Sequence, residues 1–464
     1  MSALNYKNAL NHKNALNYKK LENDLQIIYE KPKSSIPISS IQLFCNIGNI
    51  HAPKELKGIT HFIEHMCFKG TKQHPDFNNV LKQYSEYGIE YNGYSFQRYT
   101  VYVIKCQNNY LSKCIKLLAN EVLDSIFNLT EFKREEKVVI EENIISNDNP
   151  RDTLETITNK LLYENTPYEY PTDSITYHNK PYNYADVLNF YKEHYIPPNM
   201  VFSITTTVAF PTIVSMVKNS LFNKKISEKI KTTPTVHSLL LPNLINTHPL
   251  INGIKYAIKH IAKLNTLYLQ VSFQTCNQYN YKDKYRLNAI STILGGTGFN
   301  RLKTILRSNN GLVYGVYVST NYTECGGDFI ISSQFNTDSF IQKNKPSVLP
   351  LIIQELNHLI QSGITQSELN RVKNNIQGDI MLSLQNTDNQ AHYNGACLLY
   401  QSPEEIVPYT DLYKTYYEPI TRNELNACIR TYLSKMRMCV TVVGCEKKIP
   451  PLSSIKKECE KLKN

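Results

Sequence analysis

The order of strand-like and helix-like runs repeats in the two halves of this 464-residue chain, and this duplication constrains the fold most strongly. The first half has apolar strand and amphipathic helix patterns at 41–47, 77–84, 89–96, 100–106, 110–127 and 130–146. The second half has corresponding patterns at 267–273, 285–294, 312–320, 327–335, 347–361 and 365–384. We therefore expect a duplicated unit that combines a sheet with helices.

The length of the chain predicts two domains of roughly 200 residues, because one hydrophobic core rarely grows larger. Residues 1–20 repeat the hexapeptides ALNYKN, ALNHKN and ALNYKK, too short to bury a core, and are expected to form a low-complexity tail. We expect an N-terminal domain at 21–228, a polar linker at 229–262 and a C-terminal domain at 263–446. Residues 447–464 are Lys-rich and are expected to form a basic tail.

Composition favours a protein of a reducing compartment. The eleven cysteines are odd in number, scattered, and include no CxxC pair, which fits free thiols of the cytoplasm better than a disulfide framework. The mitochondrial matrix is the alternative, because the first twenty residues are basic, although they lack arginine. The sequence contains no run of about 18 apolar residues, so no membrane span is predicted. The net charge of +11 is spread along the chain without a nucleic-acid motif, so nucleic-acid binding is not expected.

The stretch GITHFIEHMCFKGT, residues 58–71, places His61 and His65 four positions apart, on one face of a predicted helix. Two imidazoles in this arrangement can bind one zinc ion. Glu64 lies on nearly the same face, where a carboxylate can act as general base beside a bound water. The alternative is a chance HxxEH match with ordinary core histidines. Buried ionisable groups need partners, however, and a metal ion would supply one.

A catalytic zinc site needs a third protein ligand, and the predicted helix at 130–146 offers four glutamates. Glu135 and Glu142 are seven positions apart and share a face, so one can bind the metal while the other supports it. The alternative is a solvated acidic face, which we prefer for Glu136 and Glu141.

Several motifs together resemble the inverted-motif zinc metallopeptidases of the pitrilysin type. HFIEHMCFKGT is followed about 77 residues later by VVIEENI, and SEYGIEYNGYSFQRYTVY, YIPPNMVFSITTTV, LGGTGFNRLKTILRSNNGLVYGVY and VTVVG are similar to further family segments. The likeness covers most of residues 21–446. It is greatest to the half-length branch that includes the β subunit of the mitochondrial processing peptidase and its bacterial relatives. The resemblance implies two homologous α+β domains, each a mostly antiparallel sheet flanked by helices.

The resemblance also implies roles for individual residues. His61, His65 and Glu142 match the ligands of one Zn²⁺ per chain, Glu64 matches the general base, and Glu135 matches a carboxylate that supports a ligand. Asn92 and Gly93 match an edge strand that pairs with substrate backbone. Arg307 and Tyr314 match a pair that contacts substrate at the catalytic centre, where Tyr314 could stabilise an oxyanion.

Asp152 matches a carboxylate that binds substrate arginine in the mitochondrial enzyme, but Thr156 stands where its second such carboxylate lies. Arginine-directed cleavage is therefore not expected.

We expect a zinc endopeptidase that hydrolyses unfolded peptides or protein segments inside a closed chamber. The second half has no HxxEH motif, so it is expected to form a wall of the chamber. Family members enclose the chamber with four such domains, which implies a homodimer or a heterodimer with a related chain. The alternatives are a non-catalytic scaffold and a subunit that is inert without its partner.

Overall fold

The computed structural model describes residues 16–172, 182–225 and 251–463, which form two compact units. Of the described residues, the first unit contains 16–143, 172, 182–225 and 380–412, and the second contains 144–171, 251–379 and 413–463. Each unit is a mixed sheet flanked by helices, so the expected α+β class is confirmed. Within the described residues, no helix is both long and apolar enough to cross a bilayer.

The first sheet has six strands in the order β1-β2-β6-β3-β5-β4. Only β2 and β6 run parallel; the other neighbours are antiparallel. The strands are β1 (Leu16–Lys20), β2 (Gln26–Glu30), β3 (Ile38–Cys45), β4 (Glu90–Ser95), β5 (Thr100–Gln107) and β6 (Met200–Thr205). The helices of this unit are α1 (Ile59–Cys67), α2 (Phe77–Glu86), α3 (Leu111–Leu123), most of α4 (Leu129–Asp148), α6 (Tyr184–His194), α7 (Phe210–Lys218) and α14 (Thr387–Leu398).

The second sheet repeats this plan with five strands in the order β7-β11-β8-β10-β9, again with one parallel pair, β7 with β11. The strands are β7 (Lys255–His260), β8 (Thr266–Thr275), β9 (Val313–Tyr322), β10 (Gly327–Asn336) and β11 (Met438–Gly444). Its helices are α5 (Pro150–Leu162), α10 (Tyr281–Gly295), α11 (Arg301–Lys303), α12 (Val348–Ser362), most of α13 (Gln366–Ser383), α15 (Arg422–Tyr432) and α16 (Leu452–Cys459).

Alternation along the strands explains why each sheet needs cover on both faces. In β8, Leu267, Leu269, Val271 and Phe273 are fully buried in the apolar core, while Gln270, Ser272 and Gln274 point to the opposite face and are buried as well. The opposite face is therefore also shielded from water, although its own side chains are polar. A helix drawn from the other half of the chain provides that cover in each unit.

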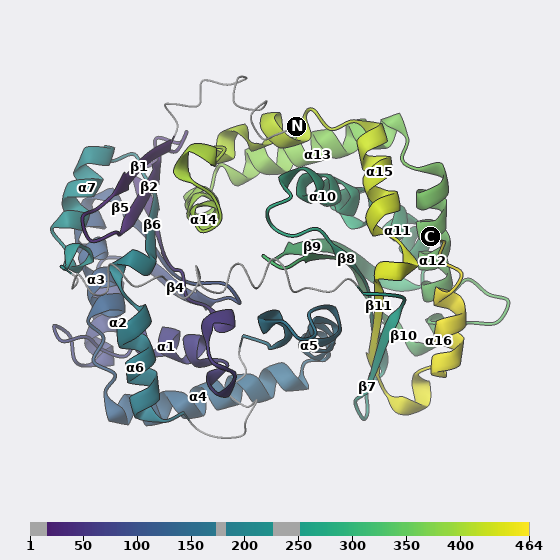
Figure 1. Ribbon diagram of the computed structural model, residues 1–464, viewed down its shortest axis with the longest axis horizontal. Helices are drawn as coiled ribbons and strands as arrows, with labels where there is room; N and C mark the ends of the chain where they lie inside the picture. The colour runs from purple at the N-terminus through teal and green to yellow at the C-terminus, as the bar shows by residue number, and fades with distance from the viewer. Residues whose placement is uncertain (1–15, 173–181, 226–250, 464) are drawn as a thin grey trace. The chain divides into compact units, whose positions relative to one another are not determined.

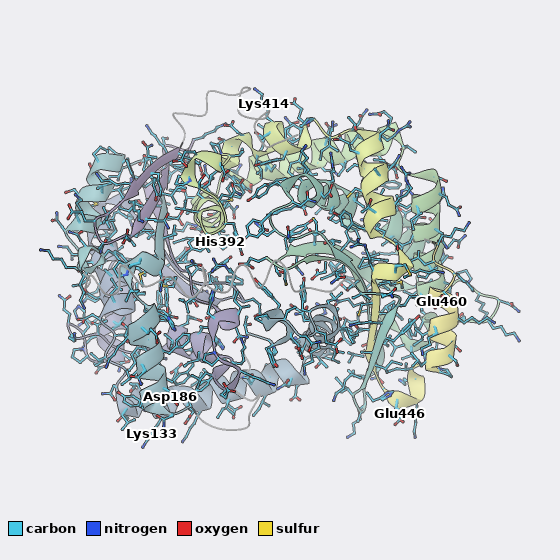
Figure 2. The ribbon with its side chains drawn as sticks, in the orientation of Figure 1. Lys133, Asp186, His392, Lys414, Glu446 and Glu460 are labelled. Carbon is cyan, nitrogen blue, oxygen red and sulfur yellow. The ribbon has the colours of Figure 1, made fainter. Side chains whose placement is uncertain are left out.

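In the first unit, α14 is the helix that covers the second face of the sheet (Figure 1). Asn394 Nδ2 donates to Glu30 Oε2 at 2.7 Å, and Ser203 Oγ donates to the Ala391 carbonyl at 2.6 Å. His392, labelled in Figure 2, brings Nδ1 within 2.9 Å of Gln42 Oε1. Gly395 lets the helix approach, because a Cβ there would meet Phe44 Cε2 at 2.2 Å.

In the second unit, α5 plays the same part against β11, β8 and β7 (Figure 1). Thr158 Oγ1 donates to Thr441 Oγ1 at 2.9 Å, and the Tyr163 hydroxyl, just after the helix, donates to Asp328 Oδ2 at 2.8 Å. Asn321 Nδ2 donates to Asp328 Oδ1 at 3.0 Å. Buried polar groups with such partners stabilise one arrangement of helix and sheet over others.

Three elements lie in segments that we expected to be tails or linker. β1 falls within residues 1–20, β7 within 229–262, and α16 within 447–464. β1 pairs with β2, and β7 with β11, which are contacts between distant parts of the chain that the short polar segments do not predict by themselves. The repeat up to residue 15 and much of the expected linker lie outside the described residues, and the expected domain boundaries stay a prediction.

Asp328 should make the stability of the second unit fall as pH rises. Burial raises the pKa of this carboxyl from 3.8 to about 7, despite the hydrogen bonds from Tyr163 and Asn321. The folded chain therefore keeps a proton that the unfolded chain has released between about pH 4 and 7, so folding weakens across that range, by an amount on the order of a few kcal/mol. Urea unfolding at pH 5 and pH 8 should show a larger loss of midpoint for the wild type than for Asp328→Asn.

The exposed Asp338 provides the matched control, since Asp338→Asn removes a carboxylate from an exposed position of the same unit. Equal midpoint losses in the wild type and Asp328→Asn would contradict the role given to Asp328.

Candidate metal centre

The helix α1 places its histidines at the edge of the first core. It begins after Gly58, whose φ of 88° lies in the left-handed region, and the Gly58 N–H donates to Asn49 Oδ1 at 2.8 Å. Phe62, Ile63 and Met66 are fully buried and each contributes about 1.5–3 kcal/mol of hydrophobic stabilisation. The same helix therefore anchors itself in the core and holds His61 and His65 on its other face.

Three potential ligand atoms converge at this face. His61 Nε2 and His65 Nε2 are 3.1 Å apart, and Glu142 Oε2 on α4 lies 3.8 Å from the first and 3.5 Å from the second. A tetrahedral zinc ion with bonds of about 2.1 Å separates its ligand atoms by about 3.4 Å. The three side chains thus fit one zinc ion without rearrangement of the backbone.

Glu135 fixes the orientation of one imidazole. Its Oε1 lies 2.9 Å from His65 Nδ1, and its Oε2 forms an ion pair of 2.8 Å with Lys69 Nζ. Burial raises the pKa of Glu135, but its bonds to His65 and Lys69 outweigh this and lower it overall. The ionised carboxylate holds Nδ1 as the protonated nitrogen of His65, which leaves Nε2 free to bind a metal.

The two histidines differ in their electrostatics. Burial and the charge of His65 lower the pKa of His61 to about 4, so this imidazole is neutral at pH 7. Burial lowers the pKa of His65 too, but the hydrogen bond to Glu135 and the nearby carboxylates raise it overall. Metal binding requires both rings to be neutral at Nε2, which the observed hydrogen bond from His65 to Glu135 permits.

Glu64 is buried beside the histidines but has a different environment from Glu142. Ligand atoms of His61, Glu64 and His65 all lie within 4.8 Å of one another, a grouping without a second example among the described residues. Burial raises the pKa of Glu64 to about 7, although the charge of His65 opposes the rise. Its Oε1 lies 2.2 Å from the position that a Cβ of Gly93 would take, so the glycine makes room for the carboxylate.

Glu64 and Glu142 could each be the third ligand by distance alone. Glu142 Oε2 faces both Nε2 atoms, and its side chain is 46% exposed, so it can move onto an ion at little cost. Glu64 is held in the core against β4, and its raised pKa suits a group that exchanges a proton near pH 7. The two carboxylates therefore differ in exposure and in which atoms they face.

Asn92 and Gly93 lie on β4, the strand at one edge of the first sheet. Within the described residues, β4 pairs with β5 alone, so its outer edge is open to another strand. Tyr94 and Asn92 are exposed there, with Asn92 Nδ2 donating to the Tyr94 hydroxyl at 2.9 Å.

Arg307, Tyr314 and Asp152 belong to the second unit. The guanidinium of Arg307 lies over the Tyr314 ring, 5.0 Å from its centroid, and Tyr314 is 81% exposed. Asp152, near the start of α5, accepts a hydrogen bond from Ser146 Oγ at 3.3 Å.

Two contacts at the site were not anticipated from the sequence. Lys69, the partner of Glu135, lies two residues beyond the end of α1, where helical spacing does not indicate it. The contact between Gly93 and Glu64 joins a strand to a helix and leaves no sequence signal.

A helix with two histidines and a glutamate, facing a second helix with two glutamates, defines the class of zinc metallopeptidases with an inverted motif. Comparison with known proteins agrees. Residues 27–174 match the family described as Insulinase (Peptidase family M16), and residues 181–376 match the Peptidase M16 inactive domain. The chain therefore belongs to the peptidase M16 family of zinc proteases, as its motifs indicated.

Two bacterial relatives have similar length. An uncharacterized zinc protease YmxG of Bacillus subtilis is 25% identical over 378 residues, which cover 81% of this chain and 86% of the relative. An uncharacterized zinc protease of Rickettsia felis is 25% identical over 396 residues, covering 84% and 89%.

Solved structures share the fold at lower identity. A protease from Helicobacter pylori has a TM-score of 0.82 at 20% identity, covering 92% of this chain and 99% of its own. The periplasmic protease PqqL from Escherichia coli has a TM-score of 0.73 at 16% identity, covering 98% of this chain but 51% of its own.

Glu135→Gln should weaken zinc binding by about 10- to 100-fold, because the amide carries no charge to hold His65 Nδ1 and Lys69. Competition with a chromophoric chelator would measure the zinc dissociation constant of each variant. Glu141→Gln is the matched control, since Glu141 lies on the same helix with its side chain exposed. Equal dissociation constants for the wild type and Glu135→Gln would show that the carboxylate does not support the ligand.

Proposed function

We propose that the protein is a zinc-dependent endopeptidase that cleaves unfolded peptides or short protein segments. The convergence of His61 Nε2, His65 Nε2 and Glu142 Oε2 within 3.8 Å of one another carries the proposal. These three side chains would hold one Zn²⁺ per chain, and Glu135 would orient His65. Family membership supports the assignment, because the relatives are zinc proteases by name.

Zinc at this position would polarise the scissile carbonyl and lower the pKa of a bound water towards about 7. Glu64 would accept a proton from the attacking water and deliver it to the leaving amine, a use that fits its pKa of about 7. Burial keeps the Glu64 carboxylate dry, which strengthens its interaction with the developing ammonium.

Substrate would bind as an added strand on the open edge of β4, at Asn92 and Gly93. Main-chain hydrogen bonds do not depend on the side chains of the substrate, so this binding mode supports broad specificity. Arg307 and Tyr314 would contact the peptide from a second domain, and the Tyr314 hydroxyl would donate to the oxyanion on the scissile carbonyl. Asp152 would face the substrate as a lone carboxylate, without the second one that arginine selection uses.

We further propose that two chains assemble to form a closed chamber, as a homodimer or with a related chain. The periplasmic protease PqqL matches this chain with 51% of its length, so one polypeptide can carry about twice this fold. Two chains of half that length would together contain the same number of domains. A reducing compartment stays our expectation for its location, since all eleven cysteines are free thiols in the structure.

Glu64→Gln should lower kcat on a quenched unstructured peptide by at least about 100-fold without loss of zinc, because it removes only the proton acceptor. Metal content by atomic absorption and initial cleavage rates would be measured together. Glu55→Gln, an exposed glutamate just before α1, is the control. If the wild type is inactive with one zinc per chain bound, the alternatives of a scaffold or an inert subunit replace the proposal.

Mixing chains would test whether one subunit completes the site of another. Glu64→Gln and Tyr314→Phe chains should each be weakly active, and their mixture should regain about a quarter of the wild-type rate if subunits exchange at random. The gain arises because a mixed dimer contains one site with both residues intact. Additive rates in the mixture, with dimers present by light scattering, would place both residues in the same chain's site.

A further inference from the structure

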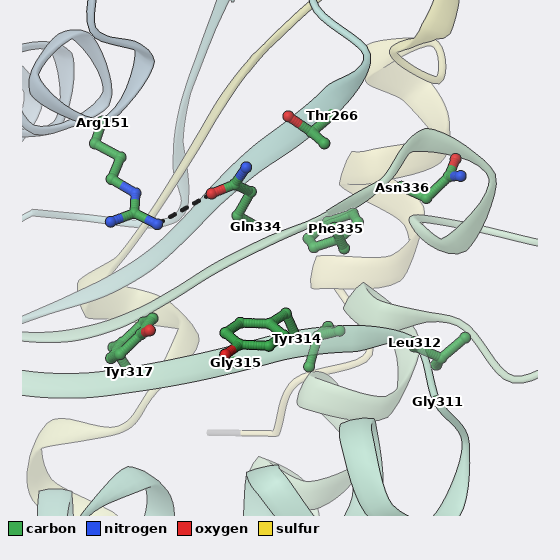
Figure 3. Close-up of a pocket in the computed structure, with 11 residues that line it drawn as sticks. Arg151, Thr266, Gly311, Leu312, Tyr314, Gly315, Tyr317, Gln334, Phe335 and Asn336 are labelled. Atoms are coloured by element: carbon green, nitrogen blue, oxygen red, sulfur yellow. Dashed lines mark hydrogen bonds between the residues drawn. The ribbon is translucent and has the colours of Figure 1, made fainter.

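A pocket of about 460 Å³ lies on the second unit, where the start of β9 meets the end of β10 (Figure 3). Its lining includes Tyr314, Gly315 and Tyr317 from β9, and Gln334 and Asn336 from β10. Arg151 from α5 completes the lining and extends towards Gln334 (Figure 3). The volume lies in the range of small-ligand sites, and it is large enough for one peptide side chain with part of its backbone.

A β-bulge creates this pocket. Gln334 is paired with Gly315, but the next residue, Phe335, is paired with Val313, so Tyr314 is an extra residue on β9. Such bulges redirect side chains, and Tyr314 accordingly stands 81% exposed. Gly315 leaves the floor open, since a Cβ there would already lie 3.2 Å from the Tyr317 hydroxyl. The pocket is thus a space between two tyrosines that a larger residue at 315 would fill.

Among the described residues that line the pocket, Arg151 is the one that carries a charge. Its Nη2 donates to Gln334 Oε1 at 3.0 Å, and in the described part of the chain its side chain has no carboxylate partner. The neighbouring Asp152 is bound instead by Ser146. A guanidinium has five N–H donors, so one neutral amide leaves most of them available to a ligand.

The position of Arg151 in α5 adds to the positive potential. The Arg151 N–H is capped by Asn149 Oδ1 at 3.0 Å, and Pro150 precedes it at the first turn of the 13-residue helix. A cation at this end of a helix is disfavoured by the helix dipole, whereas an anion is favoured. Arg151 is the residue that α5 contributes to the described pocket lining, so its guanidinium is the group of this helix that would hold a negatively charged ligand.

We propose that this pocket binds a carboxylate of the peptide substrate, with Arg151 as the residue that selects it. The planar guanidinium would hold the carboxylate through paired N–H donors, while Tyr314 and Tyr317 pack against the adjoining peptide. The carboxylate is either an Asp or Glu side chain or the C-terminus of the peptide. The proposal rests on the proposed function for its ligand being a peptide, and it makes Arg151 a specificity-determining residue.

Binding to the zinc-loaded Glu64→Gln chain would test this without turnover. The probe is an unlabelled twelve-residue peptide of Gly, Ser, Ala and Gln, blocked at both ends, whose binding is followed by isothermal titration calorimetry. One series replaces each Gln in turn by Glu, and one further peptide has a free C-terminal carboxylate. At least one carboxylate peptide should bind about tenfold more tightly than the neutral parent, as expected for a charge-assisted pair. The series that shows the gain identifies the source of the carboxylate.

Adding Arg151→Gln to that chain should abolish the gain in affinity. Arg151→Lys should retain part of it, because lysine keeps the positive charge but lacks the paired N–H donors of the guanidinium. Lys343→Gln is the control for net charge, an exposed lysine of the same unit that does not line the pocket. Gly315→Val should also reduce the gain by filling the pocket floor.

Equal affinity of neutral and carboxylate peptides, or a gain that persists in Arg151→Gln, would overturn the proposal. The experiment measures peptide affinity, so its result does not depend on whether the chain cleaves peptides. Failure of the proposed function would instead appear as a wild-type chain with bound zinc and no hydrolysis.

Discussion

Each sheet depends on a helix that its own half of the chain does not supply. β2, β3 and β6 present buried polar and apolar side chains on the face away from their core, and α14 covers them from beyond residue 386. The second sheet receives α5 from the first half in the same way. A sheet with one bare face would expose Glu30, Gln42 and Phe44 to water, so neither half completes its own fold.

At the candidate metal centre, burial and charge determine what each carboxylate can do. Glu135 is ionised because His65 and Lys69 flank it, while burial raises the pKa of Glu64 to about 7 against the opposing charge of His65. Glu142 is half-exposed and lies opposite both Nε2 atoms. Three glutamates of equal intrinsic acidity thus differ in charge and in exposure because of where they lie.

Local patterns in the sequence predict several of the helices and the residues that share a face on them. The helix at 59–67 and the face shared by His61 and His65 follow from helical periodicity, and the spacing of Glu135 and Glu142 follows from the same rule. The resemblance to the family supplied the residue roles, which periodicity alone left open between the two glutamates. The long helical runs predicted at 130–146 and 347–361 correspond to α4 and α12 within two residues at each end.

What the sequence could not indicate depends on contacts between distant residues. β1 and β7 lie in short polar segments whose patterns are too weak to predict a strand, and they become strands because β2 and β11 offer partners. The bulge at Tyr314 arises from the pairing of β9 with β10, so the exposure of Tyr314 and the pocket at Gly315 had no local signature. Gly93 likewise reads as an ordinary strand residue until Glu64 is seen to occupy the space of its missing side chain.

The cover that α14 provides has a consequence for synthesis. The last strand of the first sheet, β6, ends at Thr205 and α14 begins at Thr387, 182 positions later, so a ribosome adding roughly 5–20 residues per second needs about 9–36 s to reach the helix after its sheet has been made. Throughout that interval Phe44, Val101 and Val201 form an uncovered apolar patch on the nascent first unit. Exposed apolar surface of this kind favours aggregation, so the time that translation takes to reach α14 bears on the fraction of chains that fold.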